Sequence, residues 1–409
     1  MKKLLVVCIW LFTFSAASIA TARNLRVSGT VFEDADDDGL LDKGEIPLAG
    51  VVVSDGLTVT HTDASGYYEI YTGSDGTIFV SVPGTHHAPG NRFWRNIENP
   101  PYPGALADFP LLPNQGAADD RFTFVFVTDT HVGYGRNAKK GAAKAYASIA
   151  ASKPALVIHG GDIVFDVLAV SDEEKAIEQF DYYVKSLLPM IKAPFYHSLG
   201  NHDVFGWERR NARKSVFYGK KMYRKYFGPT YYSFNFAHCH FVILDGISRT
   251  THRGQPTYYG YVAPAQLDWL RKDLATIDPR QPVILVSHIP TINALASYFG
   301  VRSEFVTTPA GERASKHQIG NLQEVLQVFD GYNLRLVLGG HYHSYEEIHW
   351  KDNEREIMFV VGGSVCGEWW KGDRRIGLSS WPEGYTVIDV EGESFDFAYV
   401  PYGWQGTHE

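Results

Sequence analysis

Aspartate, histidine and asparagine residues recur in short clusters along the second part of the chain, each directly after a run of apolar residues. Carboxylate, imidazole and amide oxygen donors suit Mn²⁺, Zn²⁺ or iron, and the absence of a nearby cysteine excludes a wholly thiolate site. The donors are too many for one ion. A shared carboxylate can join two ions about 3.5–4 Å apart, an arrangement that supports phosphoryl transfer. The clusters are Asp129-Thr130-His131, Gly161-Asp162, Asn201-His202-Asp203, His288 and His341-Tyr342-His343.

The segments between the clusters predict the scaffold that positions them. Apolar runs of strand length alternate with four segments of helical periodicity, at Arg136–Ser152, Asp172–Ile191, Pro264–Ile277 and Ser315–Phe329. Continuously apolar strands that alternate with helices indicate a sheet covered on both faces. The carboxyl ends of such strands lie along one edge of the sheet, so we expect the five clusters to meet in one cleft.

The series DTH, GGD, GNHD, a lone His288 and GHYH resembles, in order and spacing, the calcineurin-like metallophosphoesterase superfamily over roughly residues 121–400. Five short motifs in this order, each at a strand end, are far more specific than any one of them. The resemblance implies a four-layer α-β-β-α sandwich that hydrolyses phosphate mono- or diesters with a metal-bridging hydroxide. The whole chain is similar to bacterial exported members in which a small all-β sandwich precedes the catalytic domain.

The resemblance also implies a role for each motif residue. Two divalent transition metals, Mn, Zn or Fe, would share Asp162 as a bridging ligand. His202 would remain unliganded and assist the leaving oxygen, and Asp203 would orient His202. The first metal would be bound by Asp129, His131, Asp162 and His343, and the second by Asp162, Asn201, His288 and His341.

Purple acid phosphatases, a branch of this superfamily, carry a tyrosine ferric ligand three residues after the aspartate of the GD motif. Phe165 occupies that position here, which argues against a tyrosinate-bound Fe³⁺. The neighbouring Asp166 could hydrogen-bond to a ligand or substrate, or could cap a helix. Arg136, Arg209 and Arg210 follow motif loops and could bind a further anionic group, although exposed arginines are common. The choice between monoester and diester stays open.

Residues 1–22 have the features of a secretory signal peptide. Lys2 and Lys3 precede the apolar stretch Leu4–Phe14, and Ala20–Ala22 supplies a small-residue cleavage site. The apolar stretch is shorter than the about 20 residues that span a bilayer, and no later segment is a candidate. We therefore expect an exported protein, periplasmic or secreted, without a transmembrane segment after signal removal.

The net charge indicates which class of partner the protein binds, and the cysteine content bears on disulfide formation. Removal of Lys2 and Lys3 would change the formal net charge from −8 to −10. A mildly acidic chain without a Lys/Arg cluster is a poor candidate for tight nucleic-acid binding. The expected partner is a small-molecule or cell-envelope phosphate ester. Cys239 and Cys366 would survive processing, and two separate buried thiols are favoured over a disulfide.

Residues 23–115 are expected to form an immunoglobulin-like β-sandwich ahead of a catalytic domain at 120–409, because short alternating apolar runs are divided there by turn residues. One segment places acids at positions 1, 3, 5, 9 and 12 of the EF-hand spacing, with glycine at position 6. Its flanks are strand-like, so it resembles the calcium loops of B-type repeats in bacterial surface adhesins. We favour a structural Ca²⁺ over a solvated acidic turn. The acids are Asp34, Asp36, Asp38, Asp42 and Glu45.

Three hypotheses for the function follow. The leading one is a two-metal phosphohydrolase acting outside the cytoplasm. The second is a nuclease or cyclic-nucleotide phosphodiesterase, and the missing basic stripe disfavours the nuclease. The third is a calcium-stabilised adhesin or scaffold with an inactive phosphoesterase domain, which should have lost metal ligands, whereas this chain retains every motif position.

Overall fold

The computed structural model describes residues 25–73, 76–97, 104–114, 120–133, 137–294, 304–351, 355–366 and 382–404. The expected signal peptide, the junction at 115–119 and Arg136 lie outside these ranges, so the expected signal and domain boundary stay predictions. Within the described ranges, no helix combines the length and apolar character needed to cross a membrane.

The larger part of the chain contains a five-stranded sheet in the order β13-β12-β11-β24-β25. β11, β12 and β13 pair in parallel, and β24 and β25 continue the sheet in antiparallel pairing from β11. β12 and β13 are buried along their whole length, as their apolar sequences predict. The strands are β11 (Arg121–Val127), β12 (Leu156–His159), β13 (Phe195–His197), β24 (Gly384–Glu391) and β25 (Ser394–Pro401).

A second, six-stranded sheet has the order β14-β15-β18-β21-β23-β22. Its four central strands pair in parallel, and the two edge strands pair antiparallel to them. β15 and β18 are also entirely buried. The strands are β14 (Tyr232–Phe236), β15 (Cys239–Leu244), β18 (Val283–Ser287), β21 (Leu334–Gly339), β22 (Glu346–Lys351) and β23 (Glu356–Val361).

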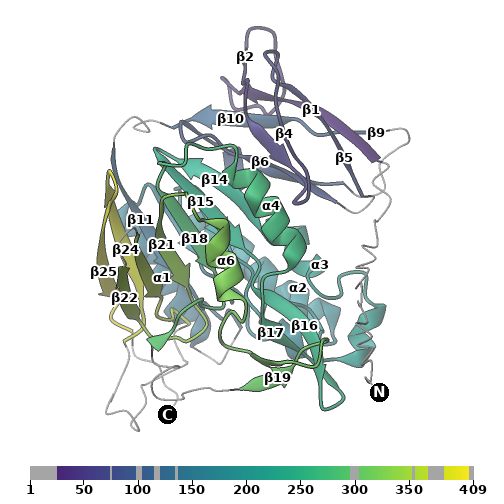
Figure 1. Cartoon of the computed structure of the whole chain (residues 1–409), viewed down its shortest axis with the longest axis vertical. Helices are drawn as coiled ribbons and strands as arrows, with labels where there is room; N and C mark the ends of the chain where they lie inside the picture. The colour runs from purple at the N-terminus through teal and green to yellow at the C-terminus, as the bar shows by residue number, and fades with distance from the viewer. Residues whose placement is uncertain are drawn as a thin grey trace, which may run out of the picture.

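Helices cover the outer faces of the two sheets (Figure 1). α4 and α6 lie over the six-stranded sheet, while α1 and α2 lie behind, on the side of the five-stranded sheet. The layer order is therefore helix, sheet, sheet, helix, which confirms the expected α-β-β-α class. Cys239 and Cys366 are both buried, and no disulfide joins them. The helices are α1 (Ala138–Ser152), α2 (Glu173–Tyr182), α3 (Lys221–Phe227), α4 (Pro264–Leu274) and α6 (Leu322–Val328).

Two of the expected helices differ from the structure. The segment expected to be helical over Asp172–Ile191 is α-helical only to Tyr182 and continues as a π turn and a 3₁₀ turn, where Pro189 cannot donate a backbone hydrogen bond. The helix expected from Ser315 begins at Leu322, because strand β20 occupies its expected start. Apolar spacing marks the buried face of a helix but not its first residue.

The N-terminal part of the chain is all-β, as expected. One sheet has the order β2-β1-β10-β7, with β5 and β9 also paired to β1, and the other has the order β4-β3-β6-β8. Gly29 is required in β1, because a Cβ there would lie 2.1 Å from the carbonyl oxygen of Ala107. The strands are β1 (Leu25–Glu33), β2 (Ile46–Pro47), β3 (Val52–Ser54), β4 (Val59–His61), β5 (Tyr67–Thr72), β6 (Thr77–Ser81), β7 (His86–His87), β8 (Trp94–Asn96), β9 (Gly104–Leu106) and β10 (Phe109–Pro113).

This β unit docks on the end of the second sheet at which β15 and β18 begin. The backbone N–H of Asn235 donates to the carbonyl of Val82 at 2.8 Å. The fully buried Trp269 of α4 donates its indole N–H to Ser54 at 3.1 Å and meets Phe79 edge to face. Two hairpins lie at the opposite end of the molecule (Figure 1). They are β16 (Ile247–His252) with β17 (Gln255–Gly260), and β19 (Phe305–Thr307) with β20 (Arg313–Ser315).

Because Trp269 of α4 packs against the β unit, we predict that its removal strongly lowers the stability of the protein. Trp269→Ala should lower the free energy of unfolding by about 3–5 kcal/mol, because it opens a cavity between the two parts. Chemical denaturation followed by circular dichroism measures this. Val216→Ala, at a side chain that is 72% exposed, should change stability by less than about 0.5 kcal/mol. Equal effects of the two substitutions would contradict the docking.

Candidate metal centre

The two sheets bring their donors to one place. The loops after β11, β12 and β13 carry every carboxylate and amide donor together with His131, and the loops after β18 and β21 carry the other three histidines. Within each sheet these strands are parallel neighbours, so their carboxyl ends coincide. All seven predicted ligands are buried. The structure therefore brings the strand-end clusters together at one place.

The loops that carry the ligands adopt an unusual backbone conformation. Eleven described residues other than glycine have positive φ, and five of them are predicted ligands. Each such residue costs on the order of 1–3 kcal/mol unless its surroundings hold it. Here the loops hold one another, since the N–H of Asp129 donates to Gly161 and the N–H of His131 donates to Asp162, both at 3.0 Å. The five residues are Asp129, His131, Asp162, His341 and His343.

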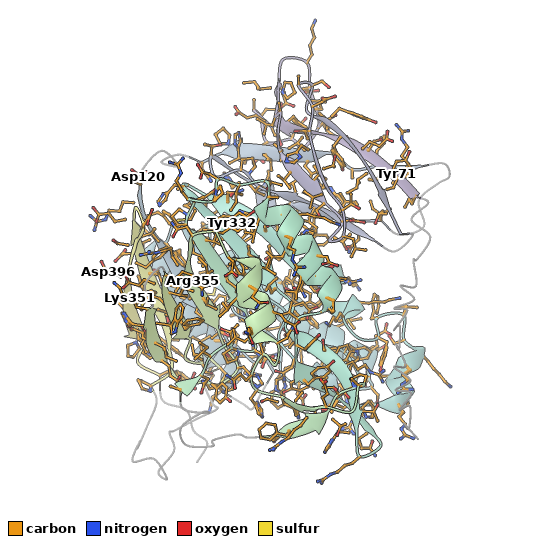
Figure 2. The ribbon with its side chains drawn as sticks, viewed as in Figure 1. Tyr71, Asp120, Tyr332, Lys351, Arg355 and Asp396 are labelled. Carbon is orange, nitrogen blue, oxygen red and sulfur yellow. The ribbon has the colours of Figure 1, made fainter. Side chains whose placement is uncertain are left out.

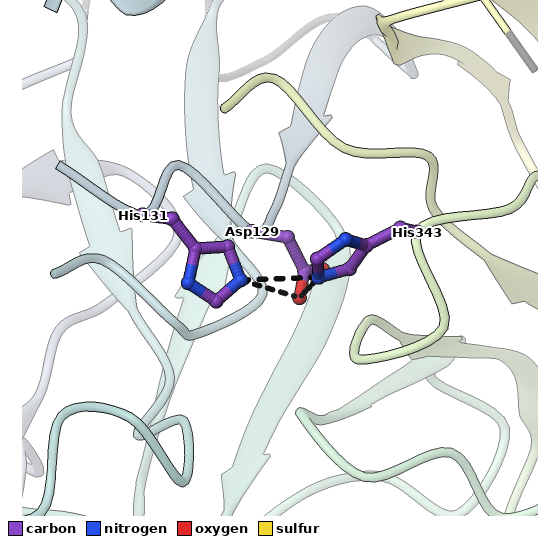
Figure 3. Close-up of side chains that lie close together, drawn as sticks. All are labelled: Asp129, His131 and His343. Atoms are coloured by element: carbon purple, nitrogen blue, oxygen red, sulfur yellow. Dashed lines mark hydrogen bonds and ion pairs between the residues drawn. The ribbon is translucent and has the colours of Figure 1, made fainter. Parts of the chain in front are cut away.

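Asp129, His131 and His343 form the first cluster (Figure 3). Nε2 of His131 lies 3.0 Å from Nε2 of His343, and Oδ1 of Asp129 lies 3.7 Å and 3.1 Å from these two nitrogens. At most one of two facing imidazole nitrogens can donate a hydrogen bond to the other. Two ligands bound to one ion at about 2.0–2.2 Å would themselves be about 3.0–3.5 Å apart, which is close to the spacing seen here.

Asp162 lies between this cluster and a second one formed with His288 and His341. Oδ2 of Asp162 is 3.7 Å from Nε2 of His131 and 3.1 Å from Nε2 of His288. Nδ1 of His288 lies 2.8 Å from the carbonyl of Gly160, a contact that fixes the tautomer and leaves Nε2 to face the cluster. This is the geometry a shared carboxylate requires.

Asn201 completes the second cluster, with its Oδ1 3.3 Å from Nε2 of His288. The donor types, the spacing of the ligand atoms and their convergence from five loops all fit a pair of divalent ions. The ligand roles themselves stay predictions.

The electrostatics of the cluster favour bound cations. Burial opposes ionisation of both aspartates, yet nearby histidines hold the pKa of Asp129 and that of Asp162 below their ordinary values. His343 acts most strongly on Asp129, and His288 acts most strongly on Asp162. Two buried carboxylates beside each other can remain ionised only where positive charge is close.

Asp203 was expected to orient His202, but its carboxylate has other hydrogen-bond partners in the structure. The Asp203 carboxylate is fully buried and accepts the backbone N–H groups of Ile163, Val164 and Gly200 at 2.8–3.1 Å. It therefore joins the two ligand loops after β12 and β13. Gly200 is the one local donor of the three, whereas Ile163 and Val164 belong to the loop that carries Asp162. Burial and the charge of Asp162 raise the pKa of Asp203.

Asp166 takes the place that was expected of Asp203. Its Oδ1 lies 3.2 Å from Nδ1 of His202, and Nε2 of His202 points to the metal cluster, 4.0 Å from Asp162. Burial would lower the pKa of His202, but Asp162 and Asp166 outweigh it and raise that pKa. The His202 side chain is 22% exposed, so it is the member of the motif that an incoming substrate can reach.

His317 is a residue that sequence reasoning missed. Its Nδ1 lies 2.5 Å from Nε2 of His341, and the side chain is buried beside the second cluster. It sits in a loop before α6 and follows no apolar strand, so it lacks the signal that marked the other histidines. His159, the last residue of β12, supports the first ligand loop, because its Nε2 lies 2.8 Å from the Thr130 hydroxyl.

The five acids of the predicted calcium loop also lie together. Two overlapping groups bring their ligand atoms within 4.8 Å of one another, Asp34 with Asp36 and Glu45, and Asp36 with Asp38 and Asp42. The Asp34 carboxylate accepts backbone N–H groups within the loop, and Glu45 closes it by accepting from the backbone of residues 35 and 42. Such bonds also occur in an acidic turn without an ion, so calcium here stays a prediction.

Two known protein families match the chain, one in each of its two parts. Residues 122–345 match the family described as calcineurin-like phosphoesterase, and residues 35–114 match its N-terminal family. The first match includes every strand-end cluster from Asp129 to His343.

Individual proteins are more distantly similar. A protein of Arabidopsis thaliana described as "Probable inactive purple acid phosphatase 14" is 21% identical over 348 residues, which cover 67% of this chain and 84% of that protein. A dimetal phosphatase from Danio rerio is 15% identical, with a TM-score of 0.44 over 69% of this chain and 99% of its own. The purple acid phosphatase PPD1 of yellow lupin (Lupinus luteus) is 13% identical, with a TM-score of 0.47, covering 88% and 68%.

The shared position of Asp162 predicts a particular pattern of metal loss. Asp162→Asn should reduce the metal content from about two transition-metal ions per chain to fewer than one, because it weakens both sites. Asn201→Ala should remove only about one ion. Elemental analysis of the gel-filtered protein measures both, with Asp245→Asn, in the ion pair with Lys220, as a control. Two ions retained in Asp162→Asn would exclude a bridging role.

Proposed function

Because this chain belongs to the calcineurin-like phosphoesterase family, we propose that it is an exported two-metal phosphohydrolase that cleaves phosphate mono- or diesters. The observation that carries this proposal is the convergence of two ligand clusters on the single carboxylate of Asp162. A scaffold with an inactive domain would have no reason to keep all seven ligand side chains buried and directed to one place. This argues against the adhesin hypothesis.

The chain's own residues divide the work of ester hydrolysis. Asp129, His131, Asp162 and His343 would hold one divalent ion, and Asp162, Asn201, His288 and His341 the other. When bound, the two ions would lower the pKa of a water so that hydroxide forms near neutral pH, and would neutralise phosphate oxygens. The family's ions suit these donors, but the choice among Mn, Zn and Fe stays open.

His202 is the residue we assign to the leaving group. Asp166 holds its Nδ1, so the ring presents Nε2 to the substrate side of the cluster. Because the neighbouring carboxylates raise its pKa, the ring can carry a proton near neutral pH and transfer it from Nε2 to the departing oxygen. In-line displacement would place that oxygen opposite the attacking water, and the partial exposure of the His202 side chain makes it accessible to a substrate.

Export and calcium belong to the same proposal and rest on the sequence pattern. The apolar stretch and small-residue site of residues 1–22 support secretion or a periplasmic location. The acids of residues 34–45 support a structural Ca²⁺ in the β unit, at the end of the molecule away from the hairpins. Substrates of the cell envelope or of small-molecule metabolism outside the cytoplasm would fit both features.

The first test of the proposed function is hydrolysis with controlled metal content. The purified protein should hydrolyse p-nitrophenyl phosphate or its bis ester, lose at least about 95% of that activity on exhaustive chelation, and recover it with Mn²⁺, Zn²⁺ or Fe²⁺. The ratio of mono- to diester rates then identifies the ester class. Full activity after chelation, or none with any of these metals, would overturn the proposal.

The second test separates His202 and Asp166 from Asp203. His202→Ala should retain both metals and lose about 10²–10⁴-fold in kcat for alkyl phosphates, but less for nitrophenyl esters, because a poor leaving group needs the proton most. Asp166→Asn should show the same leaving-group dependence to a smaller degree. Asp203→Asn should mainly lower the melting temperature. Equal losses for both ester types in His202→Ala would exclude proton donation.

A further inference from the structure

A polar cavity of about 520 Å³ opens between the loop that follows His202 and the two hairpins. Its walls come from residues 208–209, from the β16–β17 hairpin, from the start of β19 and from Lys316. The β unit lies at the opposite end of the molecule and contributes nothing to it (Figure 1). The cavity is thus formed entirely by the catalytic part of the chain.

Two of these walls connect the cavity directly to the candidate metal centre. Glu208 and Arg209 belong to the loop that begins with Asn201 and His202. On the other side, Lys316 precedes His317, whose ring contacts His341. The cavity is therefore connected through the chain both to the loop that carries His202 and to the His317–His341 contact beside the second cluster.

The charges that line the cavity are mainly positive. Arg209, Arg253 and Lys316 face two acids, Glu208 and Glu304. Lys316 already forms an ion pair with Glu304 at 3.1 Å. Glu208 accepts a hydrogen bond from the Thr257 hydroxyl at 3.3 Å. By contrast, neither Arg209 nor Arg253 has a carboxylate partner among the residues that the structure describes.

The backbone conformation at Arg253 is unfavourable for an arginine, and it therefore lowers the stability of the hairpin. Arg253 and Gly254 form its two-residue turn, with φ of 48° and 76°, a geometry for which asparagine and glycine are preferred. An arginine side chain in the first of these positions is thus unfavourable for the turn itself, which points to another use. The Arg210 guanidinium donates to the carbonyl of Gly254 at 2.9 Å, and so ties the turn to the loop that carries Arg209.

We propose that this cavity is a subsite for a second anionic group, a phosphate or a carboxylate, carried by the leaving group of the substrate, with Arg209 and Arg253 as its binding residues. This inference rests on the proposed phosphohydrolase function and adds the class of substrate. In a chain with a formal net charge of −8, two cavity-lining arginines without acid partners among the described residues give local attraction for a doubly anionic substrate.

The experiment is a ladder of matched substrates. Alkanediols of three to eight carbons are phosphorylated at one end or at both ends, as monoesters or as nitrophenyl diesters, whichever class the enzyme turns over faster. The expected result is a preference in kcat/KM of about ten-fold or more for the doubly anionic compound at one or two chain lengths. The gain should shrink as ionic strength rises.

Variants assign that preference to the cavity. Arg253→Asn keeps a residue that the turn favours, so it should fold, and with Arg209→Gln it should reduce the preference to about two-fold or less, mainly through KM. Lys351→Ala removes an exposed cation on the edge strand β22, labelled in Figure 2, and should leave the preference unchanged. Hydrolysis of p-nitrophenyl esters by the unmodified protein tests the proposed function separately.

Three results would overturn the subsite. They are an absence of preference at every chain length while nitrophenyl esters are hydrolysed, a preference that survives both substitutions, or an equal loss in Lys351→Ala. The first would indicate a leaving group without a second charge. The second would show that other residues bind the second anionic group. The third would show that the preference depends on the overall charge of the molecule and not on the cavity.

Discussion

Asp162 must stay ionised at a position from which water is excluded, and much of the surrounding structure serves that requirement. Moving a carboxylate out of water is costly unless positive charge and hydrogen-bond donors replace the solvent. Here the backbone N–H of His202 donates to its Oδ1, while His131 and His288 approach Oδ2 from different sheets. The two sheets must therefore pack so that β12 and β18 end at the same depth. A slip of either sheet would break both clusters at once.

The same requirement explains where the backbone is strained. An ordinary strand end directs its next side chains to alternate faces, but five ligands have to turn back into one small volume. Left-handed backbone conformations provide that turn, and each is unfavourable for a residue with a Cβ. The loops stabilise these turns in one another, with Asp203 acting as a buried link between the loops after β12 and β13. The backbone of these loops is therefore locally less stable, but it holds the donor side chains in a fixed arrangement.

Much of the site could be predicted from the sequence because its signal is local. A polar motif directly after a buried apolar run defines a strand end, and parallel strands bring such ends together, so Asp129, Asp162 and His288 could be placed without coordinates. The pairing of His202 could not be predicted in this way. Asp166 and Asp203 are both close to the motif in sequence, and only the direction of the Asp203 side chain toward backbone N–H groups decides between them.

His317 and the cavity are two further features that could not be predicted from the sequence. Both arise where loops from different strands meet after the sheets are assembled, and their residues carry no periodic pattern of their own. Strand-end residues and loop residues have different roles in this fold. The strand ends hold the groups that carry out the reaction, whereas the loops and hairpins beyond them determine which substrates can reach those groups. The hairpin turn at Arg253 contains none of the predicted ligands, and the hairpin is joined to the loop after His202 by the Arg210–Gly254 and Thr257–Glu208 hydrogen bonds. Substrate preference in such an arrangement can diverge between relatives that keep the same metal ligands, and a family match over the ligands therefore identifies the reaction more closely than it identifies the substrate.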